Sequence, residues 1–155
     1  MTPAINTAKK AEIDFKIHQY SHDDPVESYG TEAAEKMDVP ASQVFKTLVL
    51  NLDNTNFAVA LVPVSSMLNI KQLAKVNGVK KASMADKHDV ERLTGYVLGG
   101  VSPLGQKKKL KTLIDCSAQN FSTIFVSAGR RGLEIELSPF DLKKLTHGTF
   151  DEISQ

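Results

Sequence analysis

Two apolar runs separated by a short polar segment constrain the fold of this chain most strongly. Residues 44–52 and 57–64 are rich in Val, Leu, Ala and Phe, and Asp53-Asn54-Thr55-Asn56 between them has the length and polarity of a hairpin turn. We therefore expect two antiparallel strands that begin the buried core of a sheet. Neither run approaches the ~20 apolar residues needed to cross a bilayer, so the pattern predicts no membrane segment.

The rest of the chain reads as further short elements with recognisable ends. Thr2-Pro3 and Ser138-Pro139 are typical of helix N-termini, and Asp86 with Gly95 brackets another helix. We expect helices at 3–11, 28–37, 70–77, 86–93 and from 139, and further strands at 15–20, 112–116, 123–127 and 133–137, with a turn at Asp23-Asp24-Pro25. Because several strands are consecutive, this order favours a single α+β domain over 1–155 with a mixed, barrel-like sheet flanked by helices.

Composition narrows the class of protein. The chain has 155 residues, 41% hydrophobic and 24% charged, which is typical of one globular domain. Cys116 is the only cysteine, so an internal disulfide is impossible and a reducing compartment is expected. The first fifteen residues contain no apolar segment of a secretory signal. We therefore expect a soluble cytoplasmic protein.

Charge is unevenly distributed along the chain. The net charge is +1, but residues 71–131 contain twelve lysines and arginines against four acids. If the fold gathers this segment on one side, it would form a basic face suited to nucleic acid. The alternative is a set of solvated charges scattered over the surface.

Glycine is concentrated in two loops. Six of the nine glycines lie in 95–105 and 127–132. Such loops let backbone amides approach a ligand and donate to a phosphate or a developing oxyanion. The plainer interpretation, which the sequence favours slightly, is tight turns between strands.

The sequence offers no obvious protein nucleophile. Cys116 ends an apolar strand, which favours a buried structural thiol over a catalytic one. No Ser-His-Asp or Cys-His arrangement stands out, and the four histidines lack the spacing of a metal site. We predict neither a metal nor a cofactor.

Lys46 is unusual because it lies between Phe45 and Thr47 in an otherwise apolar strand. The strand pattern alone favours a solvated lysine at a strand end. If the side chain instead points into a cleft, desolvation would make it a clamp for phosphate or a polarising group for a carbonyl.

Four motifs resemble the YbaK-type Cys-tRNA(Pro) deacylases, and the resemblance spans nearly the whole chain. They are Phe45-Lys46-Thr47-Leu48, Met84-Ala85-Asp86, the block from Thr94-Gly95-Tyr96 to Gln106-Lys107-Lys108, and Val126-Ser127-Ala128-Gly129-Arg130-Arg131-Gly132-Leu133. This family implies a compact mixed α/β domain related to the editing domain of some bacterial prolyl-tRNA synthetases. Its activity is hydrolysis of tRNA(Pro) mischarged with cysteine.

The resemblance also implies a site. Its catalytic residues are Lys46, Gly99 and Gly100, and its substrate-binding residues are Tyr20, Thr47, Ser127 and Gly129. Glu134 lies where the family often has a shorter acid, Asp, and we assign it no role. The expected contacts to tRNA come from the basic residues Lys107, Lys108, Lys109, Arg130 and Arg131.

In the mechanism that the family suggests, the thiol of the substrate attacks its own ester carbonyl, which removes the need for a protein nucleophile. The expected partners are the acceptor end of tRNA(Pro) and prolyl-tRNA synthetase, which would recruit the protein. Cys-tRNA(Cys) is a further possible substrate. The alternatives are a deacylase for another small amino acid, such as Ala-tRNA(Pro), and a tRNA-binding or nucleotide-binding adaptor without catalysis.

Overall fold

The computed structural model describes residues 1–22 and 29–155, so the expected turn at Asp23-Asp24-Pro25 lies outside the described residues. The expected helices and strands form, with boundaries within a few residues of expectation. The structure adds two short strands, β4 and β8, and two 3-10 turns, Ala41–Gln43 and Cys116–Asn120. In chain order the helices and strands are α1 Pro3–Ala11, β1 Phe15–Gln19, α2 Tyr29–Met37, β2 Phe45–Asn51, β3 Phe57–Pro63, α3 Ile70–Val76, β4 Ser83–Met84, α4 Lys87–Thr94, β5 Lys111–Asp115, β6 Ile124–Arg130, β7 Leu133–Leu137, α5 Pro139–Thr146 and β8 Thr149–Asp151.

The helix starts follow from side-chain capping. Asp86 accepts a hydrogen bond from the Asp89 amide at the start of α4, and Ser138 accepts one from the Phe140 amide at the start of α5. Thr2 caps α1 in the same way, and its hydroxyl also donates to the Ala128 carbonyl of β6. The cap that begins α1 therefore also docks this helix on the sheet.

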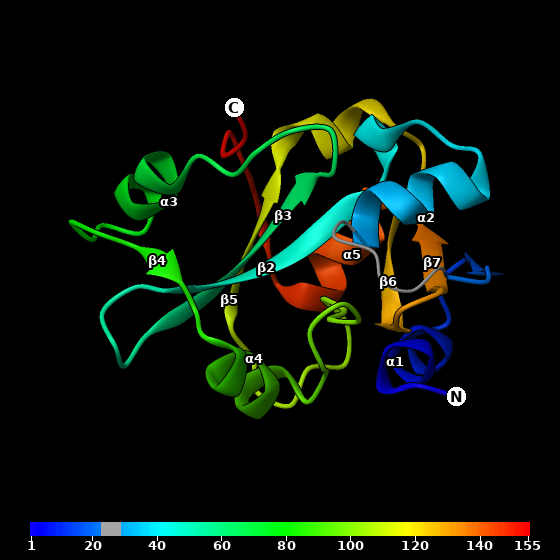
Figure 1. The fold of residues 1–155 in the computed structure, drawn as a ribbon, viewed down its shortest axis with the longest axis horizontal. Coiled ribbons are helices and arrows are strands. Elements are labelled where there is room, and N and C mark those ends of the chain that lie inside the picture. Colours follow the sequence, from blue (N-terminus) through cyan, green and yellow to red (C-terminus); the bar gives the residue numbers. More distant parts are fainter. Residues whose placement is uncertain (23–28) are drawn as a thin grey trace.

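The strands form two sheets, and the expected mixed α+β fold is confirmed. One sheet has the order β1-β7-β6 and is antiparallel, while the other has the order β4-β2-β3-β5-β8 and mixes antiparallel and parallel pairs. A parallel bridge between Val44 and Phe125 links the two sheets beside β2 and β6. The pairing of the described strands gives two linked open sheets, not one closed barrel (Figure 1).

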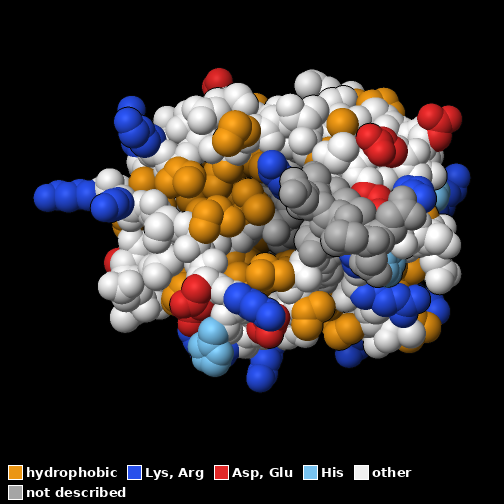
Figure 2. All heavy atoms as spheres, in the orientation of Figure 1, with side chains coloured by type: hydrophobic (Ala, Val, Ile, Leu, Met, Phe, Trp, Pro, Cys, Tyr) orange, Lys and Arg blue, Asp and Glu red, His pale blue; other side chains and the backbone are white. Residues whose placement is uncertain are grey.

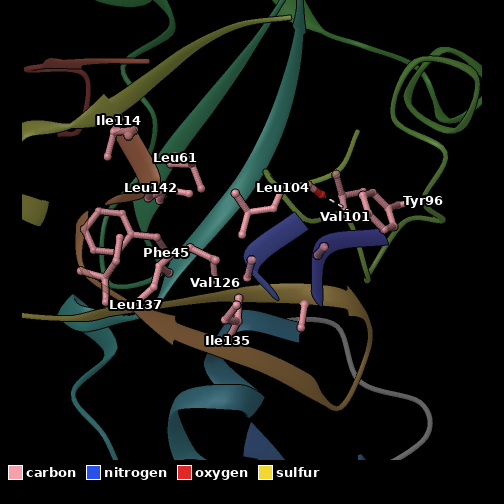
Figure 3. Close-up of a cluster of buried hydrophobic side chains, with 14 of the residues drawn as sticks. Phe45, Leu61, Tyr96, Val101, Leu104, Ile114, Val126, Ile135, Leu137 and Leu142 are labelled. Carbon is pink, nitrogen blue, oxygen red and sulfur yellow. Dashed lines mark hydrogen bonds between the residues drawn. The ribbon is translucent and has the colours of Figure 1, made fainter. Parts of the chain in front are cut away.

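The main core lies between the two sheets. Phe45 and Leu61 come from one sheet and Val126 and Ile135 from the other, and all four are at most 1% exposed. Figure 3 shows these side chains in one cluster, which also includes Leu104 of the glycine-rich loop. These packed side chains set the distance between the two sheets, because a close-packed protein interior tolerates little change in side-chain volume.

Helix α2 covers the outer face of the β1-β7-β6 sheet. Its Ala33 and Ala34 pack with Val44 and Phe125 in a separate small apolar cluster. Glu32 of α2 accepts a hydrogen bond from the Arg131 guanidinium at 3.2 Å, which ties the helix to the turn between β6 and β7. In the part of the chain that the structure describes, no helix is long and apolar enough to span a membrane.

Candidate active site

A cleft of about 430 Å³ lies where the two sheets meet. Strand β2 forms one wall, the β1-β7-β6 sheet forms the other, and the glycine-rich loop after α4 closes one side. In Figure 2 apolar side chains gather over β2 and β3 beside a hollow in this face. The described residues that line the cleft are Tyr20, Ala33, Val44, Phe45, Lys46, Thr47, Leu48, Val64, Leu98, Gly99, Val101, Ser127 and Glu134.

Lys46 lines this cleft and is half-buried. It pairs with Val62 of β3, while its neighbour Phe45 is buried in the core. Burial lowers the pKa of the Lys46 ammonium. Because no ion pair joins Lys46 to a carboxylate of residues 1–22 or 29–155, its charge is available to a ligand. The structure thus favours the cleft interpretation of this lysine over the solvated one.

The next residue, Thr47, presents a hydroxyl group that lacks a partner. Its Oγ1 atom is buried and makes no hydrogen bond to any of the described residues. A buried hydroxyl left unpaired costs on the order of 1–3 kcal/mol. A ligand or a water molecule in the cleft would relieve this cost.

The opposite wall comes from one face of the β1-β7-β6 sheet. Ser127 and Glu134 are cross-strand partners in β6 and β7, so both side chains project from the same face. Tyr20 follows β1, and its amide donates to the Gly132 carbonyl at 2.9 Å. Burial raises the pKa of the Tyr20 phenol to about 12, and the nearby Glu134 carboxylate adds to the rise.

Glu134 is the residue of the cleft to which sequence reasoning gave no role. It is 7% exposed, and burial raises the pKa of its carboxyl group from 4.5 to about 8. The signal that could have revealed its position is the alternation Leu133-Glu134-Ile135-Glu136-Leu137. The apolar residues of this strand face the core, so the two glutamates must share the opposite face, where the cleft begins.

The glycine-rich loop contributes Gly99 to the cleft wall, but Gly100 has a structural role. A turn over Val97–Gly100 is closed by the Gly100 amide, which donates to the Val97 carbonyl at 3.0 Å. Gly99 has φ of 91°, as the third position of a type II turn requires. The Gly100 amide is therefore occupied in this structure, and an added Cβ would lie 2.6 Å from the Cα of Arg130.

Gly129, also expected at the site, does not line the cleft in the described part of the chain. Its amide donates to the Ser127 hydroxyl at 3.1 Å, which fixes that side chain at the bulge of β6. With φ of 114°, an added Cβ would lie 2.9 Å from the Tyr96 ring. Gly129 thus permits close packing behind the site.

The five basic residues expected to contact tRNA do not form one patch at the cleft. Lys107, Lys108 and Lys109 are exposed, and the last two line a separate cavity of about 210 Å³ between α1 and the end of α5. Arg130 is exposed, whereas Arg131 is paired with the buried Glu32. The contact of these residues with tRNA stays a prediction.

Cys116 lies in the 3-10 turn after β5 and does not line the cleft in the described structure. It is partly exposed at the start of this turn, so the structure places it less deeply than the expected buried thiol. Burial and the neighbouring Asp115 carboxylate raise the pKa of its thiol. These conditions do not suit a nucleophile.

Comparisons with known proteins show the family to which this chain belongs. Residues 23–145 match the family model for the aminoacyl-tRNA editing domain. Over 153 residues the chain is 37% identical to EbsC of Enterococcus faecalis, provisionally named as a Cys-tRNA(Pro)/Cys-tRNA(Cys) deacylase, and the match covers 99% of this chain and 93% of that protein. The chain belongs to the aminoacyl-tRNA editing domain family.

Two further comparisons concern a proline–tRNA ligase and a solved structure. The chain is 28% identical to the proline–tRNA ligase of Geobacter metallireducens over 137 residues, a match that covers 83% of this chain but only 23% of the ligase. A solved structure described as a provisional trans-editing enzyme for prolyl-tRNA synthetase superimposes with a TM-score of 0.84 at 19% identity, and the match covers 100% of this chain and 99% of that one. This likeness shows the same fold.

Proposed function

We propose that this protein hydrolyses Cys-tRNA(Pro) in trans and releases cysteine and free tRNA. Membership of the aminoacyl-tRNA editing family and the identity with EbsC support this assignment. The observation that carries it is the cleft of about 430 Å³, which Lys46 and Thr47 line together with Tyr20 and Ser127, and in which Lys46 forms no ion pair with any of the described residues. This space is large enough for an aminoacyl group and its ribose.

The charges in the cleft suggest how the ester would be held. Lys46 is a compact cation on a flexible stem, suited to the terminal adenosine or its phosphate. A ligand that reached the Thr47 hydroxyl would supply the hydrogen bond that this group lacks among the described residues. Gly99 lines the cleft, while the Gly100 amide is already used in the turn. Of these two amides we therefore assign the oxyanion contact to Gly99 alone.

The substrate itself supplies the nucleophile in this proposal. Among the described residues that line the cleft there is no histidine and no cysteine. The cysteinyl sulfur attacks the ester carbonyl carbon, and the bond from that carbon to the ribose oxygen breaks. The thiol proton passes to this oxygen, which leaves as the ribose hydroxyl. The resulting four-membered thiolactone is then hydrolysed by water to cysteine. Holding sulfur and carbonyl together can supply effective molarities of ~10⁵ M or more.

This activity would remove errors that arise because a synthetase pocket discriminates poorly between amino acids of similar size. Cysteine and proline have similar volumes, and an apolar pocket gains only ~1–3 kcal/mol of discrimination per methylene-sized difference. A second site that requires a thiol rejects proline by chemistry instead of size. The correctly charged Pro-tRNA(Pro) has no thiol and is therefore spared.

The deciding experiment is deacylation of a panel of tRNA(Pro) charged with Cys, Ser or Ala. We expect the Cys ester to be cleaved, and the Ser ester, in which a hydroxyl replaces the thiol, to be cleaved much more slowly. Lys46→Ala should abolish turnover without unfolding the protein, because the Lys46 side chain lies outside the packed core. Lys16→Ala on β1 is the matched control, since Lys16 is exposed and outside the cleft.

Three other outcomes of this experiment would contradict the proposal or part of it. Near-normal turnover by Lys46→Ala would contradict the site. Equal cleavage of the Ala and Cys esters would refute thiol assistance and support a deacylase for small amino acids. Binding of tRNA without cleavage of any ester would support an adaptor without catalysis.

The proposed partners are the acceptor end of tRNA(Pro) and prolyl-tRNA synthetase. The modest net charge of +1 suggests weak affinity for tRNA alone, and relatives carry this domain inside a proline–tRNA ligase. We expect added synthetase to lower the KM for Cys-tRNA(Pro). An unchanged KM would argue against recruitment.

A further inference from the structure

Glu134 is buried at the cleft wall and has no hydrogen-bond or ion-pair partner among the described residues. It is 7% exposed and makes no hydrogen bond or ion pair with any of the described residues. Two residues along the same strand, Glu136 is fully engaged, accepting from the Thr123 hydroxyl at 2.6 Å and bonding His18 at 2.8 Å. Glu134 thus lacks the partners that hold its neighbour on the same face of the sheet.

Glu134 makes no contact among the described residues that would offset the free-energy cost of burying its carboxyl group. A buried carboxyl without partners destabilises the fold, and an apolar residue there would pack without this cost. The polar and charged groups that line the cleft with Glu134 are Tyr20 after β1, Ser127 on β6, and Lys46 and Thr47 on β2. Glu32 of α2 and Arg131 both act electrostatically on Tyr20. Lys46 shares the cleft but forms no ion pair with Glu134. The carboxyl group is therefore free to bind a cationic ligand.

An aminoacyl ester carries one cation, its α-ammonium group. The ribose hydroxyls and the thiol are neutral, and the phosphates are anionic and would be repelled. We propose that Glu134 binds the α-ammonium group of the aminoacyl ester, an inference that rests on the proposed deacylase function. The cleft then holds the two ends of the substrate by opposite charges, with Lys46 toward the nucleotide and Glu134 toward the amino acid.

The protonation of Glu134 fits this role. With its pKa raised to about 8 by burial, the carboxyl group is mostly protonated at neutral pH when the cleft is empty. A bound ammonium favours the carboxylate, so the proton leaves to solvent on binding. The empty cleft thus avoids an uncompensated negative charge.

This contact would also protect other esters in the cell. Peptidyl-tRNA and formylated aminoacyl-tRNA carry a neutral amide in place of the ammonium. They could not form the charge-assisted bond and would leave the Glu134 carboxyl group unpaired. Glu134 therefore restricts cleavage to esters with a free amino group.

The test compares Cys-tRNA(Pro) with tRNA(Pro) esterified with 3-mercaptopropionate, which keeps the thiol and lacks only the amine. We expect the wild type to cleave the cysteinyl ester about 10- to 100-fold faster in kcat/KM, in line with loss of one buried charged hydrogen bond. Glu134→Gln should lose most of this preference by slowing the cysteinyl ester alone. Glu136→Gln, the same change on the same strand outside the cleft, should keep the preference.

A binding measurement makes the result independent of turnover. The probe is adenosine with cysteine joined to its 3′ position through a stable amide, compared with the analogue that lacks the α-amine. Calorimetry in two buffers should show about one proton released per cysteinyl probe bound near pH 7 by the wild type, and none by Glu134→Gln.

Equal slowing of both esters by Glu134→Gln, or equal proton release by both proteins, would overturn the assignment. If the wild type cleaves neither ester, the proposed function fails. The proton release then still decides whether Glu134 binds the amine.

Discussion

Replacing Glu134 by Gln should stabilise the protein at high pH, because this substitution removes a buried ionisable group and keeps its shape. The folded-state pKa of the carboxyl group is about 8, against an ordinary value of 4.5. A group whose pKa is raised by folding contributes fully to stability below its unfolded pKa. That contribution is lost as the pH rises through the folded pKa. The window for Glu134 therefore runs from about 4.5 to about 8.

The size of the effect follows from the same two values. Between about pH 6 and pH 8 the folded state holds one more proton than the unfolded state at this site, and the slope is ~1.4 kcal/mol per pH unit. The wild type should thus lose up to about 3 kcal/mol relative to Glu134→Gln between pH 6 and pH 9. Above pH 8 the difference should level off. Other titrating groups are common to both proteins and cancel in the comparison.

Urea denaturation followed by circular dichroism at about pH 6 and about pH 9 measures this difference directly. Glu136→Gln is the control: although burial pushes the pKa of Glu136 upward, the hydrogen bonds from Thr123 and His18 hold it below its ordinary value. Its substitution should therefore remove favourable contacts and lower the free energy of unfolding, whereas Glu134→Gln should raise it at about pH 9. A free-energy difference between wild type and Glu134→Gln that does not change with pH would refute the reasoning.

Further substitutions test the packing around the site and the absence of a role for Cys116. Gly129→Ala should cost about 2 kcal/mol or more in urea unfolding, because its φ of 114° is strained for alanine and the new Cβ would meet the Tyr96 ring; an unchanged midpoint would show that the loop can shift. Arg131→Met should cost about 3 kcal/mol by removing the cation beside the buried Glu32, and pairing it with Glu32→Leu should recover part of that loss. Cys116→Ser should leave deacylation unchanged, and a large loss in a stopped-time assay would revive a protein nucleophile.

The sequence by itself determined the local elements, because their causes are local. The caps at Thr2, Asp86 and Ser138 and the polar turn between the two apolar runs specify where helices and strands begin. Alternation along Leu133–Leu137 likewise separates the core face from the outer face of β7. These patterns depend on backbone hydrogen bonding and side-chain direction within a few residues.

Tertiary structure decided the chemistry of the site, because burial and charge pairing depend on residues far apart in the chain. Motif resemblance singled out Lys46, but only the meeting of the two sheets places its ammonium in a cleft. The sequence predicts Arg131 as a contact to tRNA but does not show that it pairs with Glu32, ninety-nine positions away. The sequence assigns Glu134 no role, and only the packing around the cleft wall buries it without a partner among the described residues. Desolvation then changes its protonation, a property that the sequence does not show.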